Sequence, residues 1–118
     1  MIISKKITSI EDFIVTESVL QEFTEFIHEK YVELTNQKER ALGYVKLFRY
    51  IIQIISTKPL VIHSYQDYLK AVDLAVNRNI DITDALLAIT AVKFGGAVLT
   101  RDKDFERVKD IVKVYLTN

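Results

Sequence analysis

The chain has no cysteine, no tryptophan, one proline and three glycines among its 118 residues. Without cysteine it can form neither a disulfide nor a cysteine-ligated metal site. So little proline and glycine predicts short loops, no flexible linker and a single domain over residues 1–118. No apolar run reaches the roughly 20 residues that span a membrane. No charged start precedes an apolar segment and a cleavage site, so we expect a cytoplasmic protein.

An excess of charge of one sign is also missing, because 16 basic residues balance 16 acidic ones. A net charge of zero gives no overall attraction to nucleic acid, so any such binding must come from local patches. The hydrophobic content of 49% is typical of a folded globular domain rather than a disordered chain. The length is sufficient for a buried core.

The most informative stretch covers residues 81–105. Asp81 is a candidate N-cap for an apolar helix that carries Asp84 in its first turn. A glycine pair is expected to end this helix, and residues 97–100 then have the apolar run of a buried parallel strand. Asp102 follows that strand, at the end where parallel strands tend to present ligands. The pattern therefore predicts that the carboxylates of Asp84 and Asp102 converge on one crevice.

Hydrophobic periodicity predicts further helices and strands along the chain. We expect helices near residues 19–34, 39–56 and 65–76, and strands at 13–16, 60–63 and 111–115. The helix near 19–34 would begin with a capping box at Ser18, and the one near 65–76 with Ser64 as N-cap. The third helix is expected to turn one apolar stripe to the core: Tyr65, Tyr68, Leu69, Val72, Ala75 and Val76. Alternating strands and helices predict an α/β fold, a three-layer α/β/α sandwich with a mostly parallel sheet.

The acidic pattern resembles that of PIN-domain nucleases, especially the VapC-type toxin ribonucleases. In that family an Asp opens a helix rich in Ala and Leu, and a Thr-x-Asp sequence follows the next strand. Asp84-Ala-Leu-Leu-Ala matches the first pattern, and Thr100-Arg-Asp102 matches the second. Glu22, which we place in the first turn of the helix near 19–34, corresponds to the second acidic position of the family. The resemblance covers residues 13–115 and implies a PIN-like fold.

The resemblance implies metal-dependent hydrolysis of a phosphodiester, with RNA as the substrate. Glu22, Asp84 and Asp102 would be the catalytic and metal-binding residues, with Thr100 and Asp104 as auxiliary residues. Carboxylate oxygens suit Mg²⁺ or Mn²⁺, which can activate water and stabilise charge on a phosphodiester. A toxin of this kind would also have a small antitoxin protein as its partner.

Each acid also has an ordinary structural interpretation. Asp81 is most simply an N-cap, while Glu22 and Asp84 could be first-turn acids that complement the helix dipole. Asp102 and Asp104 could cap the next turn. The joint order of these acids, rather than any one of them, favours a site.

The remaining candidates for chemistry are weaker. His28 and His63 lack metal-ligand spacing, so we expect neither to be catalytic. The six Tyr and six Phe fall mostly on the apolar stripes, and we expect them mainly in the core rather than as base-stacking platforms.

One feature of the family is missing from the sequence. PIN domains begin with a strand that ends in Asp, and the corresponding position here would hold Ser4 or Lys5. We therefore expect an N-terminally shortened domain with a gap at the centre of its sheet and with impaired or absent nuclease activity. A second copy would fill the gap through the helix face around residues 47–55, giving a homodimer. The alternatives are an inactive PIN-like module that binds protein or RNA, and a truncated product that folds only with another copy.

Overall fold

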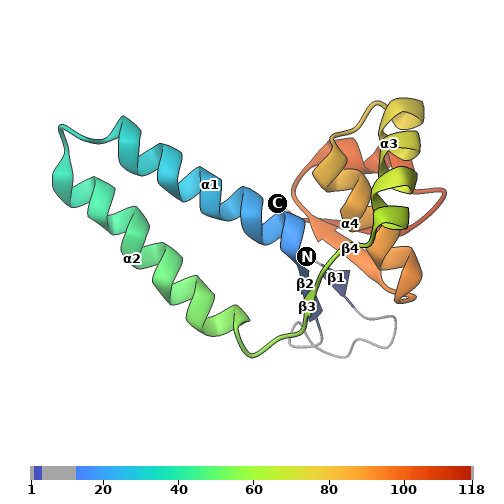
Figure 1. Ribbon diagram of the computed structural model, residues 1–118, viewed down its shortest axis with the longest axis horizontal. Coiled ribbons are helices and arrows are strands. Elements are labelled where there is room, and N and C mark those ends of the chain that lie inside the picture. The colour runs from blue at the N-terminus through green and yellow to red at the C-terminus, as the bar shows by residue number, and fades with distance from the viewer. Residues whose placement is uncertain (1, 4–12, 118) are drawn as a thin grey trace.

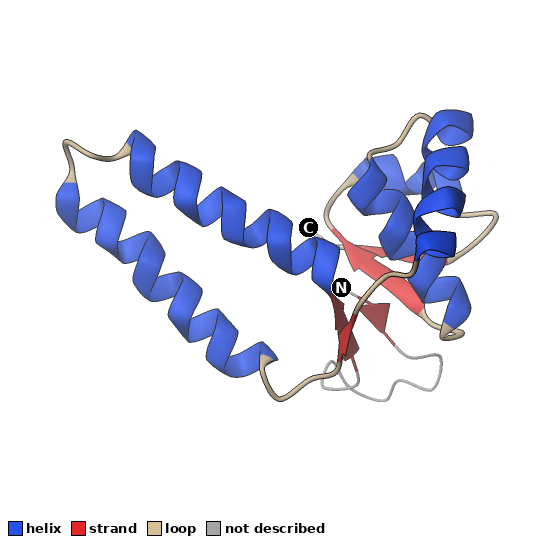
Figure 2. Cartoon of the chain, in the orientation of Figure 1, coloured by secondary structure: helices blue, strands red, loops and turns tan. Residues whose placement is uncertain are grey.

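The computed structural model describes residues 2–3 and 13–117. Its elements are β1 (Ile2–Ile3), β2 (Phe13–Thr16), α1 (Glu17–Glu33), α2 (Lys38–Ile55), β3 (Leu60–Val61), α3 (Tyr65–Arg78), α4 (Ile82–Lys93), β4 (Ala97–Thr100), the 3₁₀ helix η1 (Lys103–Val108) and β5 (Lys113–Leu116). The α1–α2 hairpin extends to one side of the sheet, and α3 and α4 gather on the other (Figures 1 and 2). Within the described residues, no helix is both long enough and apolar enough to cross a membrane.

The sheet has five strands in the order β3-β2-β1-β4-β5. β2 pairs in parallel with β3, and β4 pairs in parallel with β5, while β1 is antiparallel to both of its neighbours. The four outer strands therefore all point in the same direction, and only β1 runs the other way. This arrangement confirms the predicted α/β class with a mostly parallel sheet.

The centre of the sheet is occupied by β1. Ile2 lies opposite Ile14 of β2 on one side and opposite Val98 of β4 on the other. The expectation of an open centre is therefore wrong. β1 pairs with two of the four residues of each neighbour, and this pairing matters because an unpaired buried backbone group costs about 1–3 kcal/mol. Ser4 and Lys5, which we compared with the first acidic position of the family, lie outside the described residues.

Helix α1 begins two residues earlier than the sequence pattern predicts. Thr16 is its N-cap, and the Thr16 hydroxyl accepts a hydrogen bond from the Val19 backbone N–H at 3.4 Å. The predicted capping box at Ser18 is therefore wrong. The Ser18 hydroxyl is instead 2.9 Å from Nε2 of His63, which ties the start of α1 to the segment before α3.

Helix α3 has the start that the sequence predicts. The Asp67 backbone N–H donates to the Ser64 hydroxyl at 3.2 Å, and the Ser64 N–H donates to the Asp67 carboxylate at 2.9 Å. These hydrogen bonds, with a further ion pair to Lys93 at 3.4 Å, hold the pKa of Asp67 below its usual value. The helix ends at Asn79, which has the left-handed conformation common at helix C-termini (φ 53°). Both ends of α3 are thus fixed locally.

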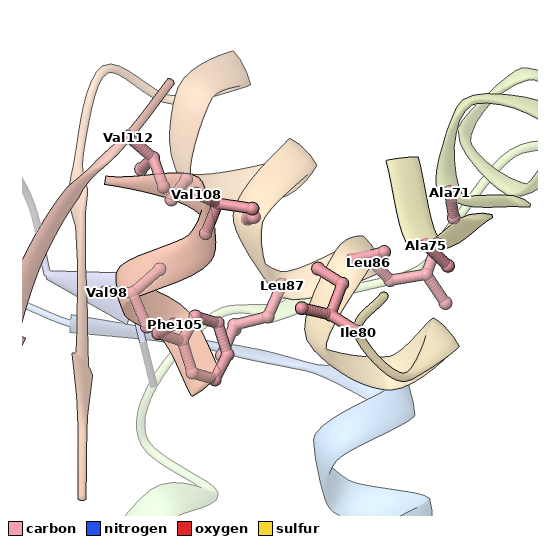
Figure 3. Packing of buried hydrophobic residues seen from close by; sticks show 12 residues of the cluster. Ala71, Ala75, Ile80, Leu86, Leu87, Val98, Phe105, Val108 and Val112 are labelled. Atoms are coloured by element: carbon pink, nitrogen blue, oxygen red, sulfur yellow. The ribbon is translucent and has the colours of Figure 1, made fainter. Parts of the chain in front are cut away.

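The core forms around α4, which is buried on more than one side as predicted. Its buried residues are Ala85, Leu86, Leu87, Ala88, Thr90 and Ala91. Leu87 lies beside Phe105 and Val98, while Leu86 lies toward Ala75 of α3 (Figure 3). One helix therefore joins the sheet, η1 and α3 in a single hydrophobic cluster.

The apolar stripe of α3, apart from Ala75, does not face the core, contrary to prediction. Tyr65 is 91% exposed and Val76 is 76% exposed, whereas the face toward α4 carries Asp67, Ala71 and Ala75. Small residues fill this contact because helices at the usual 8–10 Å spacing leave little room between them. The expectation that the aromatic residues form the core is also wrong, because Phe105 is the one buried Phe or Tyr in the described residues.

Replacement of Leu87 by Ala tests the central position of α4. Leu87 is 4% exposed, so Leu87→Ala should lower the free energy of unfolding by about 2–5 kcal/mol through lost burial and a residual cavity. Val92→Ala on the same helix is the control; Val92 is 49% exposed, and a loss below roughly 1 kcal/mol is expected. Urea denaturation measures both. Equal losses would contradict this packing.

Candidate active site

Asp84 lies in the first turn of α4 and is half-buried. The preceding Asp81 occupies the N-cap position, where its backbone carbonyl accepts a hydrogen bond from the Ala85 N–H at 2.9 Å. Its side chain makes no capping hydrogen bond, so the predicted role of the Asp81 carboxylate as a cap is wrong. The negative charge of Asp81 contributes to raising the pKa of Asp84.

Asp102 lies just beyond the carboxyl end of β4, as predicted. Its backbone N–H donates to the Thr100 hydroxyl at 3.0 Å, and its carboxylate accepts the Asp104 N–H at 2.9 Å. Asp102 is thus the N-cap of η1, the structural interpretation that the sequence left open. A carboxylate offers about four lone-pair positions, so one capping bond still allows it to bind a ligand. Thr100 holds Asp102 in position, and Asp104 also forms an exposed ion pair with Arg107 at 3.5 Å.

Glu22 lies on α1, a helix that packs against α4. Because α1 begins at Glu17, Glu22 falls in the second turn rather than in the first turn as expected. Its side chain is exposed and lines a groove along α1. The groove also contains Val19, Phe23, Glu25, Phe26 and Glu29.

The other acids of the candidate site affect the pKa of Asp84. Burial, followed by the negative charges of Asp102, Asp81, Glu22 and Asp104, raises the pKa of Asp84 to about 6. Carboxylates from α1, from the start of α4 and from the turn after β4 therefore act on one half-buried group. The charges of the acids that the sequence singled out thus all act on Asp84, and a cation beside Asp84 would relieve this repulsion.

The donor chemistry of this group fits a hard divalent cation. Mg²⁺ keeps several of its waters and binds proteins through one or two carboxylates, and Mn²⁺ also prefers oxygen ligands. The acidic side chains around Asp84 do not form a closed metal site in which protein ligands surround the ion. Among residues 2–3 and 13–117, no three His, Cys, Asp or Glu side chains lie close enough to hold one ion together. Asp84 and Asp102, with Glu22 nearby, fit an ion that has at most two direct protein ligands.

Sequence reasoning missed the contact between Ser18 and His63. These residues are 45 positions apart, so no local pattern indicates that they meet. Burial lowers the pKa of His63; Asp67 and Glu17 oppose this shift, and Lys93 adds to it. Nδ1 of His63 is buried and has no hydrogen-bond partner among the described residues, so no acid orients the ring as in a nucleophilic triad. We therefore assign the pair a structural role between α1 and α3.

The protein family that matches the chain is the PIN domain, over residues 1–111. The chain belongs to the PIN-domain family. Neither the curated proteins nor the solved structures gave a match. PIN domains have a nuclease-type fold, generally use divalent metal ions and generally bind RNA or DNA. The family predicted from the acidic pattern is confirmed.

Calorimetry with Mn²⁺ tests the residues of the candidate site. We expect weak binding by the wild type, and a loss of affinity of about tenfold or more for Asp84→Asn and Asp102→Asn, because each removes a charged ligand. Asp73→Asn is the matched control, since Asp73 is an exposed acid on α3. Equal affinity in the wild type and both site variants would remove these two residues from the site.

Proposed function

We propose that the protein is a metal-dependent ribonuclease of the PIN type that acts on cytoplasmic RNA as a homodimer. Glu22, Asp84 and Asp102 would be its catalytic and metal-binding residues, with Thr100 and Asp104 in auxiliary positions. The observation that carries this proposal is half-buried Asp84 at the start of α4, whose pKa is raised by burial and by the charges of acids on α1, at the start of α4 and in the turn after β4. Asp102 lies just beyond the carboxyl end of β4, the usual location of ligand sites in α/β folds.

A divalent cation bound by Asp84 and Asp102 would activate water and stabilise the negative charge that develops on the scissile phosphodiester. The residues of the chain hold the acidic side chains in position and set how far these side chains are exposed to water. The Thr100 hydroxyl and the Asp104 N–H fix Asp102 at the end of β4. Partial burial of Asp84 strengthens its attraction to a cation, since screening by water is reduced. Glu22 adds negative charge from α1 and would help to orient the attacking water.

A second candidate is a catalytically inactive PIN module that binds RNA or protein. The observation that favours it is the absence, within the described residues, of a group of three close ligands. An open site of this kind holds its ion weakly, so even the ribonuclease that we propose should be slow. Asp12 is a further acid of the sequence that could complete the site, and it lies outside the described residues.

An RNA cleavage assay in Mn²⁺ separates these functions. We expect slow cleavage of single-stranded RNA, reduced about 100-fold or more by Asp84→Asn because the ion loses its most buried ligand. Asp73→Asn should cleave at the wild-type rate. Binding of RNA without cleavage would support the inactive module. Undiminished cleavage by Asp84→Asn would show that this acidic group is not the active site.

We also propose a protein partner of the antitoxin kind, and the groove along α1 supports it. The groove has a volume of about 440 Å³ and combines apolar side chains with acidic ones: Val19, Phe23 and Phe26 with Glu22, Glu25 and Glu29. Such a surface fits a basic amphipathic helix, which would place apolar residues on Phe23 and Phe26 and cations beside the glutamates. Because Glu22 belongs to the groove and to the candidate site, this partner would also inhibit cleavage.

A synthetic amphipathic peptide with Leu on one face and Lys on the other tests the groove. The peptide should bind and inhibit cleavage, whereas Glu25→Lys should weaken binding about tenfold or more through like-charge repulsion. Glu39→Lys on exposed α2 makes the same charge change elsewhere and should leave binding unchanged. Fluorescence anisotropy measures all three affinities. Equal weakening by both variants would indicate attraction to overall charge rather than to this groove.

A further inference from the structure

Helix α2 has one side that the chain leaves uncovered. Its other side packs against α1, where the ring centroids of Phe48 and Phe23 are 5.5 Å apart and those of Tyr44 and Phe26 are 6.2 Å apart. Within the described residues, α1 is the one element that α2 contacts extensively. We name the uncovered side the outer α2 face. Its members are all exposed: Gly43, Lys46, Leu47, Arg49, Tyr50 and Ile54.

The apolar members of the outer α2 face form a single stripe. Leu47, Tyr50 and Ile54 follow one another at intervals of three and four residues, and they are 46%, 62% and 48% exposed. Gly43 precedes Leu47 by one turn of the helix and extends the stripe. A side-chain carbon at Gly43 would meet nothing within 4 Å, so this end of the face is open as well. The stripe is thus in contact with water over about three helical turns.

Two cations line one flank of this stripe. Lys46 and Arg49 are three residues apart, so they are neighbours on the surface of α2. Neither forms an ion pair with an acid in the part of the chain that the structure describes. Helix α2 also carries Lys38 and Arg40, against the single acid Glu39. The outer α2 face therefore combines an apolar stripe with positive charge that no neighbouring acid neutralises.

The place of α2 in the fold opens this face to a large partner. The α1–α2 hairpin extends away from the sheet, and α2 lies along one edge of it (Figure 1). With 18 residues, α2 is about 27 Å long. The glutamates of α1 lie on the opposite side of α2 from any partner bound there. Packed helices are about 8–10 Å apart, roughly one Debye length at physiological salt, so these acids act only weakly on such a partner.

We propose that the outer α2 face binds the surface of a lipid bilayer that contains anionic lipids. Helix α2 would lie in the plane of the membrane, with Leu47, Tyr50 and Ile54 at the boundary between headgroups and acyl chains. Tyrosine suits this depth because its ring is apolar and its hydroxyl is polar. Lys46 and Arg49 would extend to the anionic headgroups, which attract basic residues on amphipathic helices. One surface thus satisfies both the apolar stripe and the cations beside it.

Other occupants satisfy only part of this chemistry. A nucleic acid would pair its phosphates with Lys46 and Arg49, but it would leave the aliphatic Leu47 and Ile54 in water. A second copy of the chain, which we first expected around residues 47–55, would bring the cations of both copies together, and this opposes association. A partner helix binds in a groove, and the groove of about 440 Å³ runs along α1 rather than along the outer side of α2. A flat bilayer, in contrast, contacts a protruding helix directly.

Co-sedimentation with lipid vesicles tests the positive charge of the face. The wild type should bind vesicles of phosphatidylcholine with about 30% phosphatidylserine, and its affinity for phosphatidylcholine alone should be lower by about tenfold or more. Lys46→Gln combined with Arg49→Gln should lose about tenfold or more in affinity for the anionic vesicles. Lys70→Gln combined with Lys109→Gln makes the same charge change at exposed positions outside α2 and should bind as the wild type does. Equal losses would indicate attraction to overall charge and would overturn the proposal.

The apolar stripe has its own matched pair of variants. Leu47→Gln should weaken binding to the anionic vesicles about fivefold or more, because an apolar side chain no longer enters the membrane. Leu69→Gln makes the same change on α3, where Leu69 is 62% exposed, and should leave binding unchanged. Both leucines are exposed, so circular dichroism should show the wild-type fold for each variant. A loss caused by Leu69→Gln rather than Leu47→Gln would place the membrane contact on α3 and overturn the proposal.

The natural absence of tryptophan allows a second, independent measurement. The fluorescence of a Tyr50→Trp variant should shift to shorter wavelength when anionic vesicles are added, because the indole leaves water. Tyr65→Trp on exposed α3 should show no shift. A wild type that does not bind vesicles would overturn the proposal; a loss of RNA affinity in the Lys46→Gln and Arg49→Gln variant would then assign the face to nucleic acid. Vesicle binding requires no nuclease activity, so a failed cleavage assay leaves this result unaffected.

Discussion

The burial of α4 is the constraint on which the rest of the structure depends. Ala85, Ala88 and Ala91 are fully buried, and their small size lets α3 and the sheet approach the helix closely. Burial extends into the first turn, so Asp84 is partly removed from water by the packing that forms the core. An acid in that position, near other acids, does not stabilise the fold. In our proposal, its presence is explained by a ligand of opposite charge rather than by packing.

The parts of the fold that were predicted correctly depend on local signals. The reciprocal hydrogen bonds of Ser64 and Asp67 require only residues three apart, and the end of α4 requires only a residue that tolerates positive φ, which Gly95 provides (φ 65°). Strand β4 was predicted with its observed bounds because its apolar run lies between a helix stop and a polar turn. The acids of the candidate site could be found for the same reason, since Asp84 and Asp102 mark the ends of these elements.

The errors have a different physical origin, because they concern contacts between distant parts of the chain. Two isoleucines have no periodicity, so nothing in the sequence near β1 indicates that Ile2 pairs with both Ile14 and Val98. The contact of Ser18 with His63 is equally remote in sequence, and α1 is capped by Thr16 rather than by Ser18. Periodicity identified the apolar side of α3 correctly. It could not show what covers that side, because an interior and an interface present the same pattern before assembly.

The zero net charge conceals a strong division between the two helices of the hairpin. Helix α1 carries Glu17, Glu22, Glu25, Glu29 and Glu33 against Lys30, while α2 carries Lys38, Arg40, Lys46 and Arg49 against Glu39. RNA is repelled by the α1 side, and the acids around Asp84 add to this repulsion unless a cation neutralises them.

The same charges attract a basic protein segment, so in our proposal the cation and the inhibitory partner compete for one negative field. By linkage, each must weaken the binding of the other by the same factor. If both proposals hold, a bound cation therefore favours substrate over inhibitor, and its loss favours inhibitor over substrate. The acids around Asp84 would then control access to the site as well as the chemistry within it.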